Sequence, residues 1–346
     1  MTDHIHAVER MMKDVLTSVE QPVAHSLGEH DLSLYGMARY HLGWANPSFQ
    51  PAQYDAGKRI RPLICMYACA SVGRDPSVAV PAAAAIEFLH NFTLVHDDIQ
   101  DQSNTRRHRP TVWSLWGASQ AINVGDALFA MGQLALIRSS ERGVSPARLE
   151  RLMRGYNLVT LRIVEGQVLD LGFEDRWDIG VDHYVEMIRG KTAAILAYAA
   201  SAGALIGGAD EERVERFRAF GEALGLGFQV RDDVLGIWGE TSVTGKRKAD
   251  DIRRRKKSLP IISLAAAAQP HEREKLKEIY ERTSIDEPDV DWIIELLRRY
   301  EIQDHLEAVV SRYHDEARDI IERDAEDNDG RSALLALLDQ LARRAF

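Results

Sequence analysis

Cysteine, long hydrophobic runs and flexible linkers are all scarce in this sequence, and each scarcity excludes a class of protein. Only two of the 346 residues are cysteines, Cys65 and Cys69. Two cysteines one helical turn apart exclude a disulfide framework, and a metal site would need partners that are not visible nearby, so we expect two buried, reduced helix residues. The stretch 192–209 is almost long enough to span a bilayer, but alanine and glycine weaken its hydrophobicity. We therefore expect no membrane span. Since residues 1–20 are charged throughout, we also expect no signal peptide and a cytoplasmic location.

Strand-like alternation of polar and apolar residues is almost absent, whereas helical periodicity runs through most of the chain. No segment rich in glycine, proline or serine divides it. The pattern predicts one all-α domain over residues 1–346. The net charge of -10 argues against a dedicated nucleic-acid binder. Helices are expected over 4–19 with a break at Pro22, 33–44, 61–71, 81–101, 121–139, 145–171, from 181 onward, over 210–238 as two helices meeting near 219–226, and repeatedly after 260.

The most informative stretch is residues 82–101, an apolar helix that ends in three aspartates. Asp97, Asp98 and Asp101 stand at positions i, i+1 and i+4. On a helix, Asp97 and Asp101 share a face, where like charges repel unless a cation offsets them. An oxygen-rich, sulfur-free cluster suits magnesium, which is usually held by a few carboxylates together with substrate phosphates. A solvated acidic helix end is the alternative interpretation.

A second apolar helix ending in paired aspartates favours the metal interpretation. Gln229, Asp232 and Asp233 stand at i, i+3 and i+4, and a basic cluster follows each aspartate helix. Two such helix ends facing each other would clamp a diphosphate through divalent metal ions. The chain resembles the trans-type polyprenyl diphosphate synthases, most closely the short-chain geranylgeranyl and farnesyl diphosphate synthases. Five stretches carry this resemblance in the family's order: 57–62 (GKRIRP), 90–113, 164–171, 190–195 and 227–260.

The resemblance spans about residues 40–264, with further helices over 265–346, and it implies a helical bundle around a central cavity. It also implies a homodimer and a transferase that joins isopentenyl diphosphate head-to-tail to an allylic diphosphate. Ionisation of the allylic carbon–oxygen bond needs magnesium and basic residues to stabilise the departing charge, but no protein nucleophile. No Ser-His-Asp or Cys-His constellation is visible, which agrees with this chemistry.

The resemblance assigns two diphosphate sites. For the allylic diphosphate it implies two or three magnesium ions on Asp97, Asp98, Asp101, Asp232 and Asp233, and direct contacts from Arg106, Lys191, Lys246 and Lys256. For isopentenyl diphosphate, without magnesium, it implies Lys58, Arg61, His90 and Arg107. Thr192 and Gln229 match positions whose oxygens stabilise the cation, Lys191 stands beside them, and Gln167 and Asp170 support this wall. The released diphosphate is the expected base.

The second aspartate motif departs from the family pattern, because Gly236 stands where a third aspartate is usual. Glu240, one helical turn further on, is a possible replacement, and the metal count is left open. Phe92 and Thr93 precede Asp97 by five and four residues, about 6 to 7.5 Å deeper along the helix. A bulky residue followed by a small one resembles enzymes with twenty-carbon products, so we expect geranylgeranyl diphosphate. A fifteen-carbon product is the near alternative.

Two other classes stay open at this point. A class I terpene cyclase also ionises an allylic diphosphate, but it needs no metal-free second site such as GKRIRP and Arg107 provide. It would also carry an asparagine-serine-glutamate metal motif where this chain has Asp232 and Asp233. A non-catalytic partner subunit of a heteromeric synthase need not keep its metal ligands, whereas this chain keeps nearly all of them. The basic runs 106–109 and 253–257 resemble nucleic-acid patches, but beside aspartate motifs in an acidic chain they fit diphosphate loops better.

Overall fold

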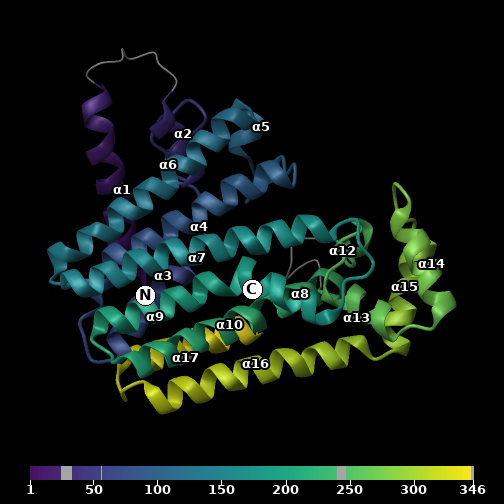
Figure 1. The fold of residues 1–346 in the computed structure, drawn as a ribbon. Helices are drawn as coiled ribbons and strands as arrows, with labels where there is room; N and C mark the ends of the chain where they lie inside the picture. The colour runs from purple at the N-terminus through teal and green to yellow at the C-terminus, as the bar shows by residue number, and fades with distance from the viewer. Residues whose placement is uncertain (25–32, 56, 240–246, 344–346) are drawn as a thin grey trace. The chain divides into compact units, whose positions relative to one another are not determined.

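A computed structural model of the chain describes residues 1–24, 33–55, 57–239 and 247–343, and within these ranges helices dominate (Figure 1). The chain divides into two compact units that are both assembled from separate parts of the sequence. The first unit comprises Met1–Leu158, Ala199–Val214 and Glu326–Gly330, and the second comprises Val159–Tyr198, Glu215–Ala325 and Arg331–Phe346. The all-α prediction is confirmed.

The first unit is built around α4 (Val80–Gln100), the helix that carries the first aspartate motif. Pro81 occupies its first turn, where a missing N–H costs nothing. The four alanines 82–85 that come next are fully buried, and their small side chains let neighbouring helices approach closely. Helix α4 lies along α6 (Ala118–Ile137) and also packs against α3 (Ile60–Ser71) and α1 (Thr2–Ala24) (Figure 1). The unit's other elements are α2 (Leu34–His41), η1 (Pro76–Ala79), α5 (Val112–Trp116), η2 (Arg138–Arg142) and the start of α7 (Pro146–Phe173).

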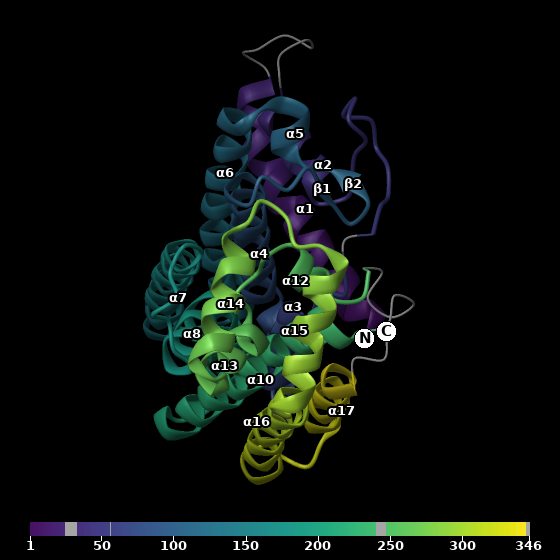
Figure 2. The same cartoon turned by 90° about the vertical axis from the view of Figure 1, so that its right-hand side faces the viewer.

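The second unit has a core formed by α8 (Val181–Ile188), α10 (Glu211–Trp238) and helices later in the chain. Figure 2 shows α14 (Pro270–Glu281) and α15 (Glu287–Arg299) as neighbours joined by a short turn, next to the long α16 (Ile302–Asp324). Asp286 caps α15 by accepting a hydrogen bond from the Asp289 amide at 3.0 Å. The remaining elements are η3 (Arg189–Ala193), the first turn of α9 (Ala194–Gly207), whose residues from Ala199 onward belong to the first unit, α12 (Asp250–Arg253), α13 (Leu259–Ala267) and α17 (Asp329–Arg343).

Two predicted helix breaks were wrong. Helix α1 continues through Pro22 to Ala24, so the proline lies in its last turn instead of ending it. Helix α10 is unbroken over residues 211–238, although two helices were expected to meet near 219–226. Gly221 explains the error: a Cβ there would lie 2.3 Å from the carbonyl oxygen of Leu196. The glycine therefore serves close helix packing within the second unit and does not interrupt the helix.

The basic run 106–109, expected in a diphosphate loop, lies in a small hairpin formed by β1 (Thr105–Arg106) and β2 (Arg109–Pro110), which pair antiparallel. This is the only named sheet in the described ranges. Its two turn residues, Arg107 and His108, have φ of 51° and 60°. Two consecutive left-handed residues are typical of tight hairpin turns, but they are strained when neither is glycine. The hairpin holds the basic run 106–109 in a fixed conformation.

The segments that come nearest to a membrane span differ from the one expected from the sequence. The stretch expected to approach a membrane span, 192–209, lies largely in the 14-residue helix α9. Among the described residues two other segments, Pro76–Gln100 and Ala118–Arg142, are long and apolar enough to cross a membrane by length and composition alone. The first is 72% buried inside the protein, as a core helix is, and the second is 44% buried. The exposed face of the second bears Ile122, Leu134 and Ile137.

Helix α7 also has an apolar face that is exposed. In the second unit, Leu161, Val164, Val168 and Leu171 succeed one another at helical spacing and are between 37% and 64% exposed. Side chains at spacings of three and four residues lie on one side of a helix. The two units thus each expose an apolar helix face.

Candidate active site

The turn that carries GKRIRP is anchored by a buried ion pair. Arg59, at the start of α3, has a φ of 51° and a guanidinium only 1% exposed. It pairs with Glu87 of α4, which is 3% exposed, and lies 3.5 Å from Glu9 of α1. Asn91 donates to the same Glu87 carboxylate at 2.8 Å. Breaking a buried ion pair leaves an uncompensated charge and is costly. The Arg59–Glu87 pair therefore holds the backbone at Arg59 in place, between Lys58 and Arg61, two residues that are predicted to bind isopentenyl diphosphate.

Arg61 and His90 lie side by side, as predicted for one site. Their closest nitrogens, Arg61 Nη1 and His90 Nε2, are 3.2 Å apart. Burial, together with the charges of Arg61, Arg107, Arg106 and Arg59, holds the pKa of His90 well below its usual value. A neutral His90 can accept a hydrogen bond at Nε2 from Arg61 Nη1, so it orients that guanidinium and adds no charge of its own.

The hairpin brings Arg107 to the same place. A Cβ on Gly57 would lie 2.7 Å from Arg107 Nη2, and Gly57 has a φ of 81°, so only glycine fits this turn. Lys58 is exposed beside it. Arg109 anchors the hairpin between two tyrosine rings, with its guanidinium carbon 4.2 Å from the centre of Tyr40 and 4.1 Å from that of Tyr54. Lys58, Arg61, His90 and Arg107 therefore share one basic region of the first unit, hereafter the cationic pocket.

The first aspartate motif lies at the C-terminal end of α4, where the helix dipole already disfavours negative charge. Asp98 is 2% exposed and pairs with Arg106 of the hairpin, whose Nε donates at 2.9 Å. Burial raises the pKa of Asp98, the Arg106 contacts lower it, and the charge of Asp101 raises it. Asp97 is half-buried and Asp101 is exposed. Arg106, predicted to contact the diphosphate, is thus also the partner of an aspartate.

Of the two residues predicted to set product length, Phe92 belongs to a row of aromatic rings, hereafter the aromatic stack. The Phe92 ring lies 4.8 Å from that of His96 and 5.5 Å from that of Phe129 on α6. Phe129 in turn lies 5.8 Å from the fully buried Tyr156. The Thr93 hydroxyl donates to the carbonyl of His90 at 2.8 Å. Phe92, His96 and Phe129 are half-buried, and Phe92 lies between the other two rings.

In the second unit, Asp233 is the centre of a hydrogen-bond network. Tyr184 OH donates to Asp233 Oδ2 at 2.7 Å, and Gln229 Nε2 donates to Oδ1 at 3.1 Å. The Thr192 hydroxyl donates to Gln229 Oε1 at 2.9 Å, which joins the two residues predicted to stabilise the cation. Burial raises the pKa of Asp233 to about 7; its hydrogen bond from Tyr184 opposes this, while the charge of Asp232 adds to it. Asp232 itself is half-buried.

Lys191 and Thr192 lie in η3, a five-residue π-helical turn between α8 and α9. Lys191 Nζ donates to Asp170 of α7, so these two predicted residues are in contact. A Cβ on Gly166 would lie 2.2 Å from the Lys191 amide nitrogen, and one on Gly190 would lie 2.8 Å from the Arg162 carbonyl oxygen. Two glycines therefore seat the turn directly on α7. Gln167, one residue from Gly166, is buried.

The residues of the basic run 253–257 make different contacts. Arg253 Nη2 donates to Glu287 at 2.7 Å, and Lys257 Nζ donates to the carbonyls of Glu174 and Arg176 at 2.7 and 2.9 Å. Lys256 is exposed. The predicted ligand Lys246 and the possible replacement Glu240 lie outside the described residues.

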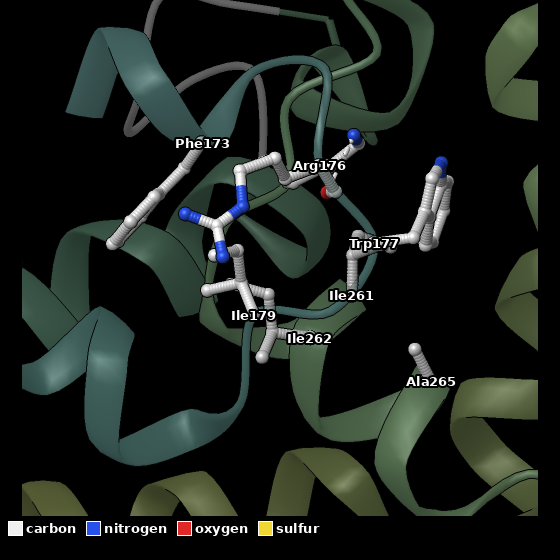
Figure 3. A pocket seen from close by; sticks show the side chains of 8 residues that line it. Phe173, Arg176, Trp177, Ile179, Ile261, Ile262 and Ala265 are labelled. Atoms are coloured by element: carbon white, nitrogen blue, oxygen red, sulfur yellow. Dashed lines mark hydrogen bonds between the residues drawn. The ribbon is translucent and has the colours of Figure 1, made fainter. Parts of the chain in front are cut away.

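Lys257 also borders a small pocket, which Figure 3 shows from close by. Its lining residues are Phe173, Arg176, Trp177, Ile179, Lys257, Ile261, Ile262 and Ala265. Arg176 is held in two hydrogen bonds to Asp178, at 2.9 and 2.7 Å. Both cations that line the pocket, Arg176 and Lys257, are thus bound to protein acceptors, and the other lining side chains are apolar. None of the residues predicted to bind diphosphate lines this pocket.

The residues missed by sequence reasoning are the partners of the predicted ones. Glu87, Arg59, Tyr184 and Arg109 contact or position them, yet none stands next in sequence to its partner. Tyr184 and Asp233 are 49 residues apart. Glu87 lies on the helix that also carries His90 and the first aspartates, which is the one signal for its role; Tyr184 lies on α8, which carries no predicted site residue.

The family model for polyprenyl synthetases matches residues 45–297. The chain belongs to the polyprenyl synthetase family. The (2E,6E)-farnesyl diphosphate synthase of Mycobacterium tuberculosis is 38% identical over 75% of this chain and 70% of that protein. The geranylgeranyl diphosphate synthase of the same organism is 41% identical over 66% of this chain and 64% of that protein.

Solved structures agree with this family assignment. A polyprenyl synthetase from Streptomyces coelicolor A3(2) has a TM-score of 0.82 at 34% identity, covering 97% of this chain and 99% of that one. A polyprenyl synthase from Caulobacter crescentus, solved with calcium and isoprenyl diphosphate, has a TM-score of 0.80 at 30% identity, covering 100% and 96%. The family uses divalent metal ions.

The donor chemistry of the aspartate motifs fits such an ion. Asp97, Asp98 and Asp101 offer only oxygen, as does Asp232, which suits magnesium. Among the described residues, no three acidic, histidine or cysteine side chains converge as a metal site by themselves. Magnesium is commonly held by one or two carboxylates plus substrate phosphates, so the motifs agree with a metal that arrives with its diphosphate.

Proposed function

We propose that this member of the polyprenyl synthetase family condenses isopentenyl diphosphate head-to-tail with an allylic diphosphate, and that its product is geranylgeranyl diphosphate. The main support for this proposal is the cationic pocket. The GKRIRP turn and the hairpin meet there, since Gly57 lies close to the Arg107 guanidinium. A pocket of cations with a neutral histidine suits a diphosphate bound without metal. A terpene cyclase has no use for that second site.

Each group of residues takes a separate part in the reaction. Asp97, Asp98, Asp101, Asp232 and Asp233 are the proposed magnesium residues, and Asp233 acts by orienting its neighbours, since protein donors occupy both its oxygens. Two or three bound magnesium ions would supply charge neutralisation for the leaving diphosphate. Direct contacts to that diphosphate come from Arg106, Lys191, Lys246 and Lys256.

The cationic pocket holds the second substrate. Lys58 and Arg107 bind the isopentenyl diphosphate, and Arg61 grips it in the orientation that His90 sets. Thr192 and Gln229 direct oxygen lone pairs at the allylic cation. The alkene of isopentenyl diphosphate attacks that cation, the new carbon–carbon bond forms, and the released diphosphate takes the proton.

Product length depends on the aromatic stack. Phe92 blocks the growing chain, with Thr93 leaving room beside it, at the length that gives twenty carbons. Farnesyl diphosphate is the alternative product. We expect Phe92→Ala to lengthen the product, because Phe129 and Tyr156 lie beyond it.

We also propose that the chain is one domain and works as a cytoplasmic homodimer. The family match at 45–297 includes residues of both compact units, which supports one domain. The exposed apolar faces of α6 and α7 support a second copy as their cover, because apolar patches on that scale mark interaction surfaces. Sedimentation should give a dimer, and Val168→Lys should shift it to a monomer; a monomeric wild type would contradict the proposal.

The test of function is product analysis with magnesium, labelled isopentenyl diphosphate and primers of five, ten and fifteen carbons. We expect geranylgeranyl diphosphate that disappears with chelator or in Asp97→Ala. Farnesyl diphosphate as end product would keep the reaction and refute the Phe92 interpretation. Cyclic hydrocarbons without use of isopentenyl diphosphate would indicate a cyclase, and no turnover would indicate a non-catalytic subunit.

A further inference from the structure

The two aspartate motifs differ at one position. The first motif has aspartates at i, i+1 and i+4, namely Asp97, Asp98 and Asp101. At the same spacing the second motif has Asp232, Asp233 and then Gly236. Residues at i and i+4 share a helix face, so a carboxylate is missing from the face of α10 that carries Asp232.

Another carboxylate occupies the space that a side chain at 236 would fill. A Cβ built on Gly236 would lie 2.2 Å from Asp251 Oδ2 and 2.6 Å from its Cγ. Separations below 3.0 Å do not occur between real atoms of this kind, so the Asp251 carboxylate and any side chain at 236 exclude each other. The carboxylate of Asp251 therefore stands against the α10 backbone at the missing position.

The chain holds Asp251 there firmly. It belongs to the first turn of α12 and is 6% exposed. The amide of Ala249 donates to the carbonyl of Ile237 on α10 at 3.0 Å, which ties the two helices together next to Gly236. The neighbouring Ala249 and Ile252 are buried in the core of the second unit. The negative charge of Asp251 also raises the pKa of Asp233, so it acts electrostatically on the motif.

We propose that Asp251 supplies the carboxylate that Gly236 lacks, so that Asp232, Asp233 and Asp251 together form the second magnesium-diphosphate motif. The motif is then discontinuous: two aspartates come from α10 and the third from α12. This inference rests on the proposed function, and it replaces Glu240 as the compensating residue.

The experiment measures ligand binding separately from catalysis. Inorganic diphosphate is titrated calorimetrically into the full-length protein at fixed magnesium concentrations, and the number and affinity of bound Mn²⁺ ions are measured by electron paramagnetic resonance. Asp251→Asn is the test variant. Asp250→Asn, its neighbour on the same turn, which pairs with Arg254 at 3.0 Å, is the matched control.

We expect Asp251→Asn to weaken magnesium-dependent diphosphate binding about 10-fold or more, with Asp250→Asn close to wild type. Equal affinity in Asp251→Asn and wild type would overturn the proposal. The double variant Gly236→Asp/Asp251→Gly moves the carboxylate back onto α10. It should recover binding relative to Asp251→Gly alone, and no recovery in a folded double variant would also count against the proposal.

Failure of the proposed function has a different signature. If the wild type neither binds diphosphate with magnesium nor turns over isopentenyl diphosphate, the function is wrong. If it does both and Asp251→Asn matches it, only the role of Asp251 is wrong. Circular dichroism of each variant establishes that a loss of binding is not a loss of folding.

Discussion

The cationic pocket of the first unit and the carboxylate network of the second carry opposite charges, but each shifts the pKa of one buried group toward its neutral form. In the pocket, Arg59, Arg61 and Arg107 gather around His90, whose pKa is driven well below its usual value. In the network, Asp232 and Asp251 surround Asp233, whose pKa is raised to about 7. In each region burial and like charges discourage one titratable group from ionising. The group then serves as a hydrogen-bonding partner, and the remaining charges are kept for the ligand.

The two regions should differ in which kinetic constant they control. Asp232→Ala removes stabilisation of the departing charge, and we expect kcat to fall on the order of 1000-fold. Arg61→Ala removes a charge-assisted hydrogen bond to isopentenyl diphosphate, so its KM should rise about 10- to 100-fold with a smaller change in kcat. Steady-state kinetics with both substrates varied will measure the split. If Arg61→Ala lowers only kcat, the pocket is not a binding site.

Stability depends on the ion pair beneath the cationic pocket. Glu87→Ala leaves the guanidinium of Arg59 buried without its partner, and we expect unfolding to become easier by about 3–5 kcal/mol. Urea denaturation monitored by circular dichroism measures this change. Glu9→Ala is the control, since Glu9 is 23% exposed and 3.5 Å from Arg59, and its effect should be below about 1 kcal/mol. Equal effects would show that Glu87 is not the anchor.

The carboxylate network should tolerate the loss of one donor better. Tyr184→Phe removes a neutral hydroxyl from Asp233 but leaves Gln229 and the Leu259 amide, which lies 3.4 Å from Oδ2. We expect a loss of about 1–3 kcal/mol in the same denaturation experiment. A loss larger than that of Glu87→Ala would reverse the ranking of the two regions.

A separate prediction concerns the pH dependence of stability. Burial and nearby arginines lower the pKa of His41 to about 3. Unfolded chains therefore bind more protons than folded ones between about pH 6.5 and 3, and stability falls as the pH is lowered through this window. We expect His41→Gln to flatten the slope of unfolding free energy against pH by up to about 1.4 kcal/mol per pH unit below 6.5. An unchanged slope would mean that His41 is not held neutral.

Features that depend on local sequence patterns could be predicted, whereas features that depend on contacts between distant residues could not. Helix composition and the aspartate spacing are local properties, so the sequence predicts α4, α6 and the two aspartate motifs; that these aspartates bind metal stays a prediction. The helix junction expected near 219–226 is wrong, because sequence does not reveal that Gly221 packs closely against Leu196. The partners Glu87 and Tyr184 could not be identified, since hydrogen bonds across 28 and 49 residues leave no periodic signal. The hairpin at 105–110 was missed because its turn uses arginine and histidine where glycine or asparagine is usual.

The π-helical turn at 189–193 has a further consequence for how this chain can change. A single π turn is in effect one extra residue accommodated within a helix. Deleting one residue between Arg189 and Ala193 would let α8 run into α9 as a regular α-helix, and the flanking helix faces would keep their phase. Within the turn itself the register would change, so Lys191 and Thr192 could no longer both reach Asp170 and Gln229. We therefore expect a change of one residue in this turn to affect these two contacts more than the packing of α8.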